Sequence, residues 1–338
     1  MKFLRLYWLP ILLGLIILAA FLSKLIQPAT TAVQPLPARI ASSTPEEWEP
    51  PKIDTLAENE YGQLIRYGHE LIANTSKYFG PKGKIAAITN GMNCQNCHID
   101  AGARAFGNCF SAVASTYPKY RERSGKIESV EFRVNECMER SLNGKKIDSL
   151  SKEMRAMVAY LKWIGQHVPK GTKPRGAGTE ELVFMERAAD IEKGKQVYIK
   201  KCQLCHGGEG EGKFNTDSTG YLYPPVWGTK SYNVSAGLYR LSRFAGYVKN
   251  TMPFGSTHKN PQLTNEEAWD VAAYVNSKPH PQKFFKYDWP DIRTKPVDYP
   301  FGPYADGFTE KQHKYGPFPP IKEAKEKLSK TAPVTAKK

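Results

Sequence analysis

The sequence has 338 residues, enough for two small domains with appended segments. Lys and Arg number 48 against 33 Asp and Glu, and the resulting formal net charge of +15 favours anionic partners or substrates. The basic residues are spread along the chain without a basic helix or finger motif, which argues against a nucleic-acid-binding protein.

The N-terminus has the pattern of an export signal. Lys2 and Arg5 precede a nearly uninterrupted apolar run at residues 6–22, and such a pattern leaves the N-terminus inside while the rest of the chain crosses the membrane. No clean small-x-small cleavage site follows, so we favour an uncleaved membrane anchor at residues 1–26 over a removed signal peptide. We therefore expect an exported protein on the periplasmic side, anchored to the cytoplasmic membrane by an N-terminal helix.

The next segment is rich in proline. Residues 27–53 hold six prolines among small and polar residues, which predicts an extended tether. An ordered strap over the first domain, anchored by Trp48, is the alternative. Beyond it, residues 60–73 place apolar side chains at helical spacing, and this helix resembles the N-terminal helix of a class I cytochrome c.

The motif Cys-x-x-Cys-His occurs twice, at residues 94–98 and 202–206. It is the attachment signal for c-type haem, in which two thiols form thioethers and the histidine supplies an axial nitrogen to iron. A redox Cys-x-x-Cys or half a zinc site would not explain the histidine in both copies. We therefore predict two covalently bound haem c groups. The attachment cysteines are Cys94, Cys97, Cys202 and Cys205, and the axial histidines are His98 and His206.

Helical patterns surround both motifs. Residues 151–164 follow the first, residues 181–202 lead into the second, and residues 264–277 follow it behind a capping box. The pattern predicts a mainly α fold with two tandem class I cytochrome c-like domains. The expected domains are 54–170 for haem 1 and 180–280 for haem 2, with a linker at 171–179.

The last part of the chain changes character. Residues 281–338 begin with aromatic residues and prolines and predict an irregular, extended tail that wraps the domains. From about Ile321 the tail becomes Lys-rich, and we expect disorder at its end.

The identity of the sixth iron ligand distinguishes a haem that carries electrons from a haem that catalyses a reaction. In the second domain Met252, followed by Pro253, lies 46 residues after His206, where a His/Met cytochrome c has its methionine. Lys249 and His258 are rival ligands nearby, and Met252 as a plain core residue is the remaining alternative.

The first domain has no Met-Pro at the comparable place. Cys137 stands 39 residues after His98, and the adjacent Met138 would face another way on a helix. A thiolate close to basic residues has a depressed pKa and is a good soft ligand for iron. In an oxidising compartment, however, Cys137 could instead form a disulfide with Cys109.

Two segments carry a resemblance to a known family. Residues 117–125 (YPKYRERSG) and 132–144 (FRVNECMERSLNG) resemble the catalytic haem region of the dihaem thiosulfate dehydrogenases, which form tetrathionate. The resemblance extends over about residues 61–279. Cys109 and the long C-terminal tail do not map onto the family pattern.

The resemblance implies a set of site residues. It implies that the catalytic haem is ligated by His98 and Cys137 and the second by His206 and Met252, with Lys249 as a neighbouring lysine. The implied active-site residues beside Cys137 are Arg123, Arg133 and Ser141.

The chemistry of this reaction suits these residue types. Joining two thiosulfates into tetrathionate releases two electrons, which two one-electron haems can hold. A cysteine can carry a sulfur adduct as nucleophile, and guanidinium groups suit sulfonate oxygens. We expect electrons to pass from the Cys137 haem to the Met252 haem and on to a cytochrome c or other periplasmic acceptor. The same site would also serve a tetrathionate reductase.

Two other functions remain open. The chain could be a dihaem electron-transfer protein without its own substrate, in which Cys137 pairs with Cys109. It could also be a subunit of a sulfur-oxidising complex, where cysteine-ligated haems also occur.

Overall fold

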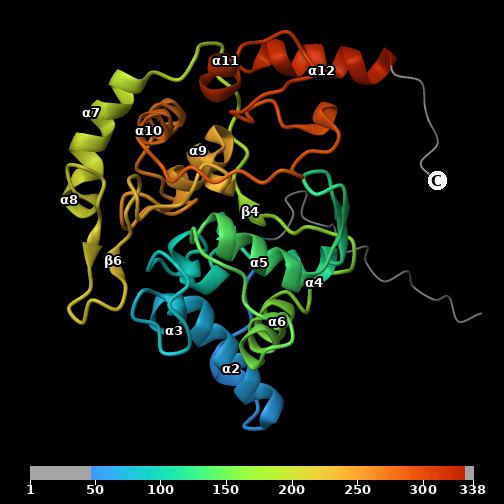
Figure 1. Cartoon of the computed structure of the whole chain (residues 1–338), viewed down its shortest axis with the longest axis vertical. Coiled ribbons are helices and arrows are strands. Elements are labelled where there is room, and N and C mark those ends of the chain that lie inside the picture. The colour runs from blue at the N-terminus through green and yellow to red at the C-terminus, as the bar shows by residue number, and fades with distance from the viewer. Residues whose placement is uncertain (1–46, 332–338) are drawn as a thin grey trace, which may run out of the picture. The chain divides into compact units, whose positions relative to one another are not determined.

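The computed structural model describes residues 47–331, all within one compact unit (Figure 1). The predicted anchor at residues 1–26, most of the tether at 27–53 and residues 332–338 lie outside the described part. Within that part no helix is long and apolar enough to cross a membrane. The described chain is mainly helical, as expected, with three short two-stranded sheets.

The first haem-motif region is built from five α-helices and short connecting elements. The predicted helix at 60–73 is confirmed, and the one at 151–164 is confirmed with Ser151 as the N-cap that accepts from the Met154 backbone N–H at 3.1 Å. The helices are α2 (Glu60–Ala73), α3 (Thr75–Phe79), α4 (Val113–Thr116), α5 (Val130–Arg140) and α6 (Lys152–Ile164). The 3-10 turns are η1 (Ile53–Thr55), η2 (Cys94–Asn96) and η3 (Asp100–Gly102).

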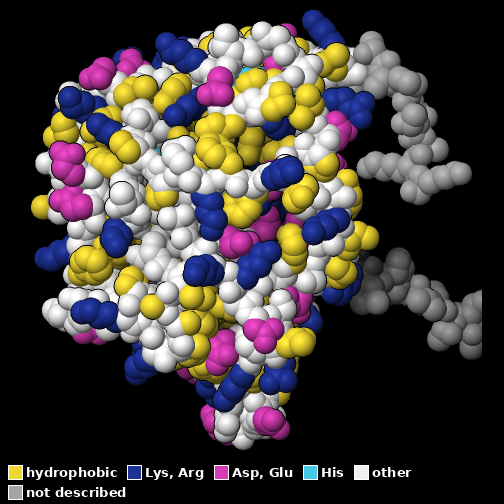
Figure 2. Space-filling view, in the orientation of Figure 1, with side chains coloured by type: hydrophobic (Ala, Val, Ile, Leu, Met, Phe, Trp, Pro, Cys, Tyr) yellow, Lys and Arg dark blue, Asp and Glu magenta, His cyan; other side chains and the backbone are white. Residues whose placement is uncertain are grey.

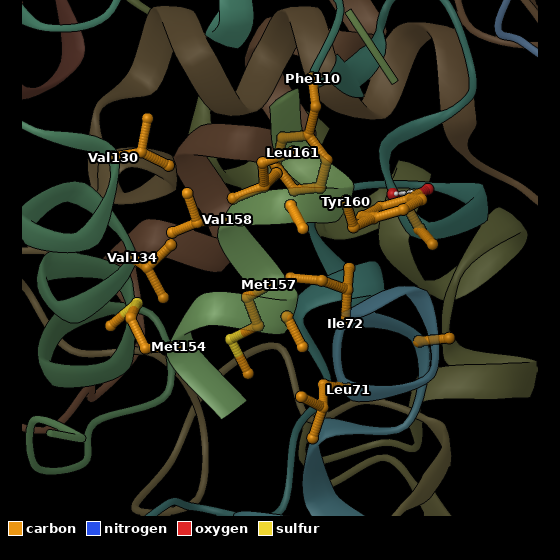
Figure 3. Packing of buried hydrophobic residues seen from close by; sticks show 14 of the residues in the cluster. Leu71, Ile72, Phe110, Val130, Val134, Met154, Met157, Val158, Tyr160 and Leu161 are labelled. Carbon is orange, nitrogen blue, oxygen red and sulfur yellow. Dashed lines mark hydrogen bonds between the residues drawn. The ribbon is translucent and has the colours of Figure 1, made fainter. Parts of the chain in front are cut away.

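The crossing of α2 and α6 forms the core of this region (Figure 3). Leu71 from α2 and Met154 and Met157 from α6 are fully buried there. The helices approach closely because Gly68 of α2 has no side chain; a Cβ at this position would lie 2.0 Å from the Ala156 carbonyl oxygen. Removal of this apolar surface from water is the main force that holds the region together.

The second haem-motif region repeats this arrangement. Its helices are α7 (Ile191–Lys201), α8 (Gln203–His206), α9 (Leu241–Thr251) and α10 (Asn265–Ser277), with the 3-10 turn η4 (Gly237–Tyr239). Here α7 crosses α10 at Gly194, where a Cβ would lie 1.9 Å from the Asp270 carbonyl oxygen. A Cβ built on either glycine would also lie 2.9 Å from a tyrosine Cβ, that of Tyr160 on α6 or that of Tyr274 on α10. The two regions therefore contain the same type of helix crossing, in which a glycine of the first helix lies against a backbone carbonyl of the last.

One predicted helix is too long. The expected helix at 181–202 begins only at Ile191, because the Asp190 side chain caps it by accepting from the backbone N–H groups of Glu192 and Lys193. Ahead of this cap the chain is irregular, and Val183, expected on the apolar face, is 81 % exposed. The capping predicted for α10 is confirmed, with Thr264 and Glu267 forming a capping box.

The short strands tie connecting segments to the helices. Strand β1 (Gly107–Cys109) pairs antiparallel with β4 (Gly178–Thr179), with Gly107 opposite Thr179, so the predicted linker ends in a strand. Strands β2 (Lys119–Arg121) and β3 (Lys126–Glu128) form a hairpin, and β5 (Lys213–Phe214) pairs with β6 (Tyr221–Tyr223).

The described end of the predicted tether is an ordered strap over the first region, as in the alternative prediction. Trp48 packs against the first core, and its backbone N–H donates to the Arg175 carbonyl at 3.4 Å.

The C-terminal segment is more ordered than expected. Residues 281–309 are irregular except for η5 (Ile292–Thr294), but α11 (Glu310–Tyr315) and α12 (Pro319–Thr331) follow. The expectation of a wholly extended tail is therefore wrong for residues 310–331. Phe318 and Ile321 are buried in the core of the second region and hold this end in place. A buried ion pair between Asp298 and Arg240 adds a second attachment.

Candidate functional site

The first motif is held by the turn on which it lies. The Asn93 side chain and the Asn96 side chain cap η2 reciprocally, and the Cys94 backbone N–H donates to the Thr75 hydroxyl at 3.0 Å. The His98 Nδ1 lies 2.5 Å from the Asn108 carbonyl oxygen. Since a carbonyl can only accept, Nδ1 carries the proton and Nε2 is left with its lone pair.

The second motif has the same arrangement. The His206 Nδ1 donates to the Pro224 carbonyl at 2.8 Å. Burial lowers the pKa of His206 and lowers the pKa of His98 to about 4, so both imidazoles are neutral at pH 7. A neutral imidazole whose Nδ1–H is fixed by a carbonyl is the form that binds a metal through Nε2.

Cys137 projects from α5 toward the first motif. Val134 and Met138 of this helix are buried in the first core, and Cys137, on another face, is half-buried. Burial raises the pKa of Cys94 and Cys97 to about 12, and the charge of Cys137 contributes to the shift of both. The structure therefore brings the Cys137 thiol near both attachment cysteines, which lie 40 and 43 residues before it in the sequence.

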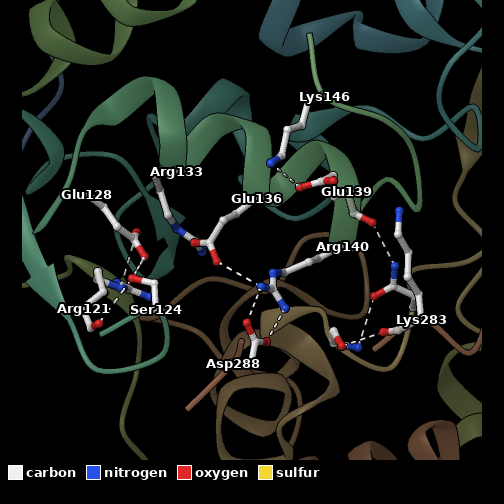
Figure 4. A network of polar contacts seen from close by, with 12 residues as sticks. Arg121, Ser124, Glu128, Arg133, Glu136, Glu139, Arg140, Lys146, Lys283 and Asp288 are labelled. Carbon is white, nitrogen blue, oxygen red and sulfur yellow. Dashed lines mark hydrogen bonds and ion pairs between the residues drawn. The ribbon is translucent and has the colours of Figure 1, made fainter. Parts of the chain in front are cut away.

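Arg133 lies beside Cys137. The charge of Cys137 is the largest cause of the raised pKa of Arg133, ahead of Glu136. One turn along α5, the Glu136 carboxylate accepts from Arg133 Nη1 at 2.9 Å and lies 3.2 Å from Arg140 Nη2. Arg140 in turn donates two hydrogen bonds to Asp288, at 2.6 and 2.8 Å (Figure 4).

Arg123 is the cation of this group without a carboxylate partner, although its guanidinium carbon lies 5.9 Å from the centre of the Trp289 ring. The residue is 8 % exposed, and its Nε and Nη1 atoms are buried without a hydrogen bond. Burial lowers its pKa to about 10, and the positive charges of Arg140 and Arg133 contribute, yet the group remains charged at pH 7. A buried, unpaired guanidinium is costly unless an anion binds to it, so this position is suited to an anionic ligand.

Ser141 ends α5 one turn after Cys137. Its backbone N–H donates to the Cys137 carbonyl at 2.9 Å, which places the two residues on the same side of the helix end.

The candidate sixth ligand of the second centre lies at the end of α9. Met252 caps this helix, its backbone N–H donates to the Val248 carbonyl, and its side chain packs against the second core. The two rivals have protein partners: Lys249 Nζ donates to the Leu263 carbonyl at 3.2 Å, and His258 Nε2 lies 3.2 Å from an Arg175 nitrogen.

Cys109 lies apart from this group. It is buried on β1, where its Sγ donates to the Gly176 carbonyl at 3.1 Å and lies 3.2 Å from the Ser111 hydroxyl. Cys109 and Cys137 are both free thiols, so the alternative disulfide is not formed.

Two charged residues of the site, Glu136 and Asp288, were not among the residues predicted from the sequence. Glu136 lies three residues after Arg133 and four before Arg140, a helical spacing that predicts ion pairs and is readable in advance. Asp288 lies 148 residues from Arg140, and no local pattern connects them.

The residues present fit c-type haem. Each motif offers two thiols and an imidazole with a free Nε2, and a candidate sulfur ligand is present for each centre in Cys137 and Met252. The unpartnered Arg123 nitrogens also fit an anionic group next to the first centre. These donor types are those that hold haem covalently and axially.

Two family models match the chain. Residues 84–169 match the SoxA/TsdA cytochrome c domain, and residues 191–279 match the cytochrome c family. The two matches contain the two haem motifs and leave the segment after residue 279 unmatched.

The chain is also similar to characterised enzymes. It is 37 % identical over 244 residues to a thiosulfate dehydrogenase of Psychrobacter arcticus, covering 71 % of each chain. It is 35 % identical over 235 residues to that of Stutzerimonas stutzeri, covering 70 % of this chain and 73 % of the other. The solved thiosulfate dehydrogenase TsdBA of Marichromatium purpuratum matches with a TM-score of 0.65 and 28 % identity, over 81 % of this chain and 55 % of that longer chain.

Proposed function

This chain belongs to the thiosulfate dehydrogenase family and carries two cytochrome c domains, and we propose that it joins two thiosulfates into tetrathionate at the first centre. The supporting observation is the group formed by Cys137, the arginines beside it and the buried, unpartnered Arg123. An electron carrier has no reason to place a cysteine and a serine among arginines in this way. The same site would also catalyse the reverse reaction, as a tetrathionate reductase.

The residues proposed to hold the cofactors follow from the two motifs. His98 with Cys137 would ligate the first haem and His206 with Met252 the second, with Lys249 three residues before Met252 as a neighbouring lysine. When bound, the two haems supply one-electron acceptors for the two electrons of the reaction. Thiolate ligation lowers the potential of the first centre relative to a thioether-ligated second centre, so electrons would leave through the second.

The sulfur chemistry is assigned to Cys137. The Cys137 thiolate and the terminal sulfur of one thiosulfate form an S–S bond with the loss of two electrons. The terminal sulfur of a second thiosulfate then attacks the bound sulfur and displaces the Cys137 thiolate, which yields tetrathionate. The terminal sulfur of thiosulfate is itself anionic, so its attack needs no general base.

The arginines hold the substrate anions. Thiosulfate is a dianion whose sulfonate oxygens accept hydrogen bonds, and Arg123 has two buried donors without a partner. Arg133, next to Cys137, would stabilise the thiolate and attract the anion toward it. Ser141, at the end of the same helix, offers a further donor. Over the visible face the Lys and Arg side chains are distributed rather than gathered (Figure 2), so substrate selection is assigned to the buried arginines.

Localisation and partners are part of the proposal. We place the protein on the periplasmic side of the cytoplasmic membrane, held by its N-terminal segment, because c-type haem motifs need an exported chain. Its electron acceptor would be a cytochrome c or another periplasmic carrier.

The test is turnover of the holoenzyme with thiosulfate and an excess of an artificial oxidant. We expect tetrathionate as the product, and we expect Cys137→Gly to lose turnover while both haems stay attached, as counted by mass. Cys109→Ala is the matched control, because this thiol is buried away from the arginines, and it should retain activity. Normal turnover by Cys137→Gly would contradict the assignment.

A further inference from the structure

The segment after the second cytochrome c domain reaches back to the arginines of the first. Residues 284–290 follow the last residue matched by either family model, 279. We propose that Asp288 in this segment is a positioning residue for the reaction: through Arg140 and Glu136 it holds Arg133 in place beside Cys137. This inference rests on the function proposed above and adds a residue from outside both haem domains.

Arg140 is the link between the segment and α5. Its guanidinium donates two hydrogen bonds to Asp288, lies 3.2 Å from Glu136 and stacks with its central carbon 3.8 Å from the centre of the Phe285 ring. The Arg140 side chain is 6 % exposed and that of Asp288 13 %. A two-bond arginine–carboxylate pair with so little solvent has a defined geometry and is strong.

The charges of the group depend on Asp288. Three guanidinium groups (Arg123, Arg133 and Arg140) face two carboxylates, those of Glu136 and Asp288, and the Cys137 thiolate of the proposed reaction would supply the third negative charge. Loss of the Asp288 charge would therefore leave this group with one excess positive charge. Without the Asp288 charge, Glu136 would be the only carboxylate partner left to Arg140. Glu136 would then be drawn toward Arg140, and its hydrogen bond to Arg133 would weaken.

The backbone of the segment is held independently of the Asp288 side chain. The Trp289 backbone N–H donates to the Arg123 carbonyl at 2.7 Å, and Lys283 Nζ donates to the Gly144 carbonyl at 2.8 Å. Gly125 leaves room for Pro290, whose Cγ would lie 2.5 Å from a Cβ at that position. An amide in place of the Asp288 carboxylate therefore removes the charge and leaves the segment in place.

The experiment compares Asp288→Asn with Asp291→Asn in the full-length holoenzyme. Asp291 lies directly after this segment but pairs with Arg293 at the surface, so its loss should change nothing at the site. For Asp288→Asn we expect kcat to fall by between about tenfold and a hundredfold, the range for a misplaced reacting group. The KM for thiosulfate should not rise, because the site has gained positive charge.

A second readout does not depend on turnover. Loss of a negative charge near the first haem favours its reduced form, so the midpoint potential of this centre should rise in Asp288→Asn and stay unchanged in Asp291→Asn. Asp288→Glu, which keeps the charge, should restore the potential. The proposal is overturned if Asp288→Asn matches the control in both kcat and potential, or if only KM changes. If the wild-type protein forms no tetrathionate, the proposed function fails instead. The midpoint potential of the first centre still tests whether the Asp288 charge acts on that centre.

Discussion

The Tyr247 hydroxyl donates a 2.6 Å hydrogen bond to the carbonyl oxygen of Asn96, a residue that lies between the two cysteines of the first haem motif. Tyr247 belongs to α9, whose next turn ends at Met252. One helix of the second domain therefore touches the first attachment loop and carries the candidate ligand of the second centre. The Tyr247 side chain is buried, Asn96 is half-buried, and the bond joins the two regions directly.

Loss of this hydrogen bond should destabilise the protein measurably. We expect Tyr247→Phe to lower the free energy of unfolding by about 1–2 kcal/mol, because the half-buried Asn96 carbonyl loses its hydrogen bond to the buried Tyr247 side chain. Denaturant unfolding of the holoprotein measures the change. Tyr61→Phe is the control, since Tyr61 is 58 % exposed, and its effect should stay within about 0.5 kcal/mol.

Substitution of Arg123 should separate substrate binding from structure. We expect Arg123→Gln to raise the KM for thiosulfate by about tenfold or more, because a hydrogen bond to a charged group contributes about 1.5–3 kcal/mol. The free energy of unfolding should not fall, since an unpaired buried charge is removed. A clear loss of stability with an unchanged KM would show that Arg123 holds a haem propionate instead.

The Asp298–Arg240 pair should make the attachment of the tail dependent on pH. Burial opposes ionisation of Asp298, but Arg240 and the Ser242 hydroxyl outweigh it, and the pKa of Asp298 lies below its ordinary value of 3.8. A lowered carboxyl pKa stabilises the fold above the unfolded pKa, and this contribution is lost as the pH falls through the folded value.

Asp298→Asn should therefore lower the free energy of unfolding by about 3–5 kcal/mol at pH 7, as for other broken buried pairs. The difference from wild type should shrink as the pH falls below about 4. Urea unfolding at pH 6 and pH 3 tests this expectation. Asp54→Asn, at an exposed position, should show no such dependence, and a difference independent of pH would contradict the role of the charge.

The helix crossing in the second domain should not tolerate a methyl group. In Gly194→Ala the new Cβ would meet the Asp270 carbonyl at 1.9 Å, so α7 and α10 must move apart. We expect a loss of about 2 kcal/mol or more in the free energy of unfolding. Gly237→Ala is the matched control, because nothing lies within 4 Å of a Cβ there. Equal stability of the two variants would rule out close packing as the role of Gly194.

The features that follow local rules are predictable from the sequence. The two haem motifs, α2, α6 and α10 all depend on short spacings and caps such as Ser151 and Thr264, and these helices match the expected ranges. The start of α7 differs because the cap at Asp190 outweighs the apolar pattern before it. The helices of the tail follow from packing of Phe318 and Ile321 against a distant core, which no local pattern contains.

In the candidate site, too, some features follow from local sequence and others from long-range packing. Cys137 and the arginines of α5 lie on one helix, so the sequence alone indicates that they are neighbours. The ion pair of Glu136 with Arg133 could likewise be predicted, because the two residues are three positions apart on that helix. The burial of Arg123 and the pairing of Asp288 with Arg140 depend on long-range packing. Only the folded chain brings them together.

The distance in sequence between Arg140 and Asp288 means that two separate parts of the chain complete the site. The core of the first haem region is built from residues 65–164 and Tyr221, so this region can pack before the segment that holds Asp288 is in place. At that stage Arg140 has only one carboxylate partner, Glu136, and the site carries an extra positive charge. A chain cut before residue 288 would therefore keep the residues proposed to hold both haems but lack the second carboxylate partner of Arg140.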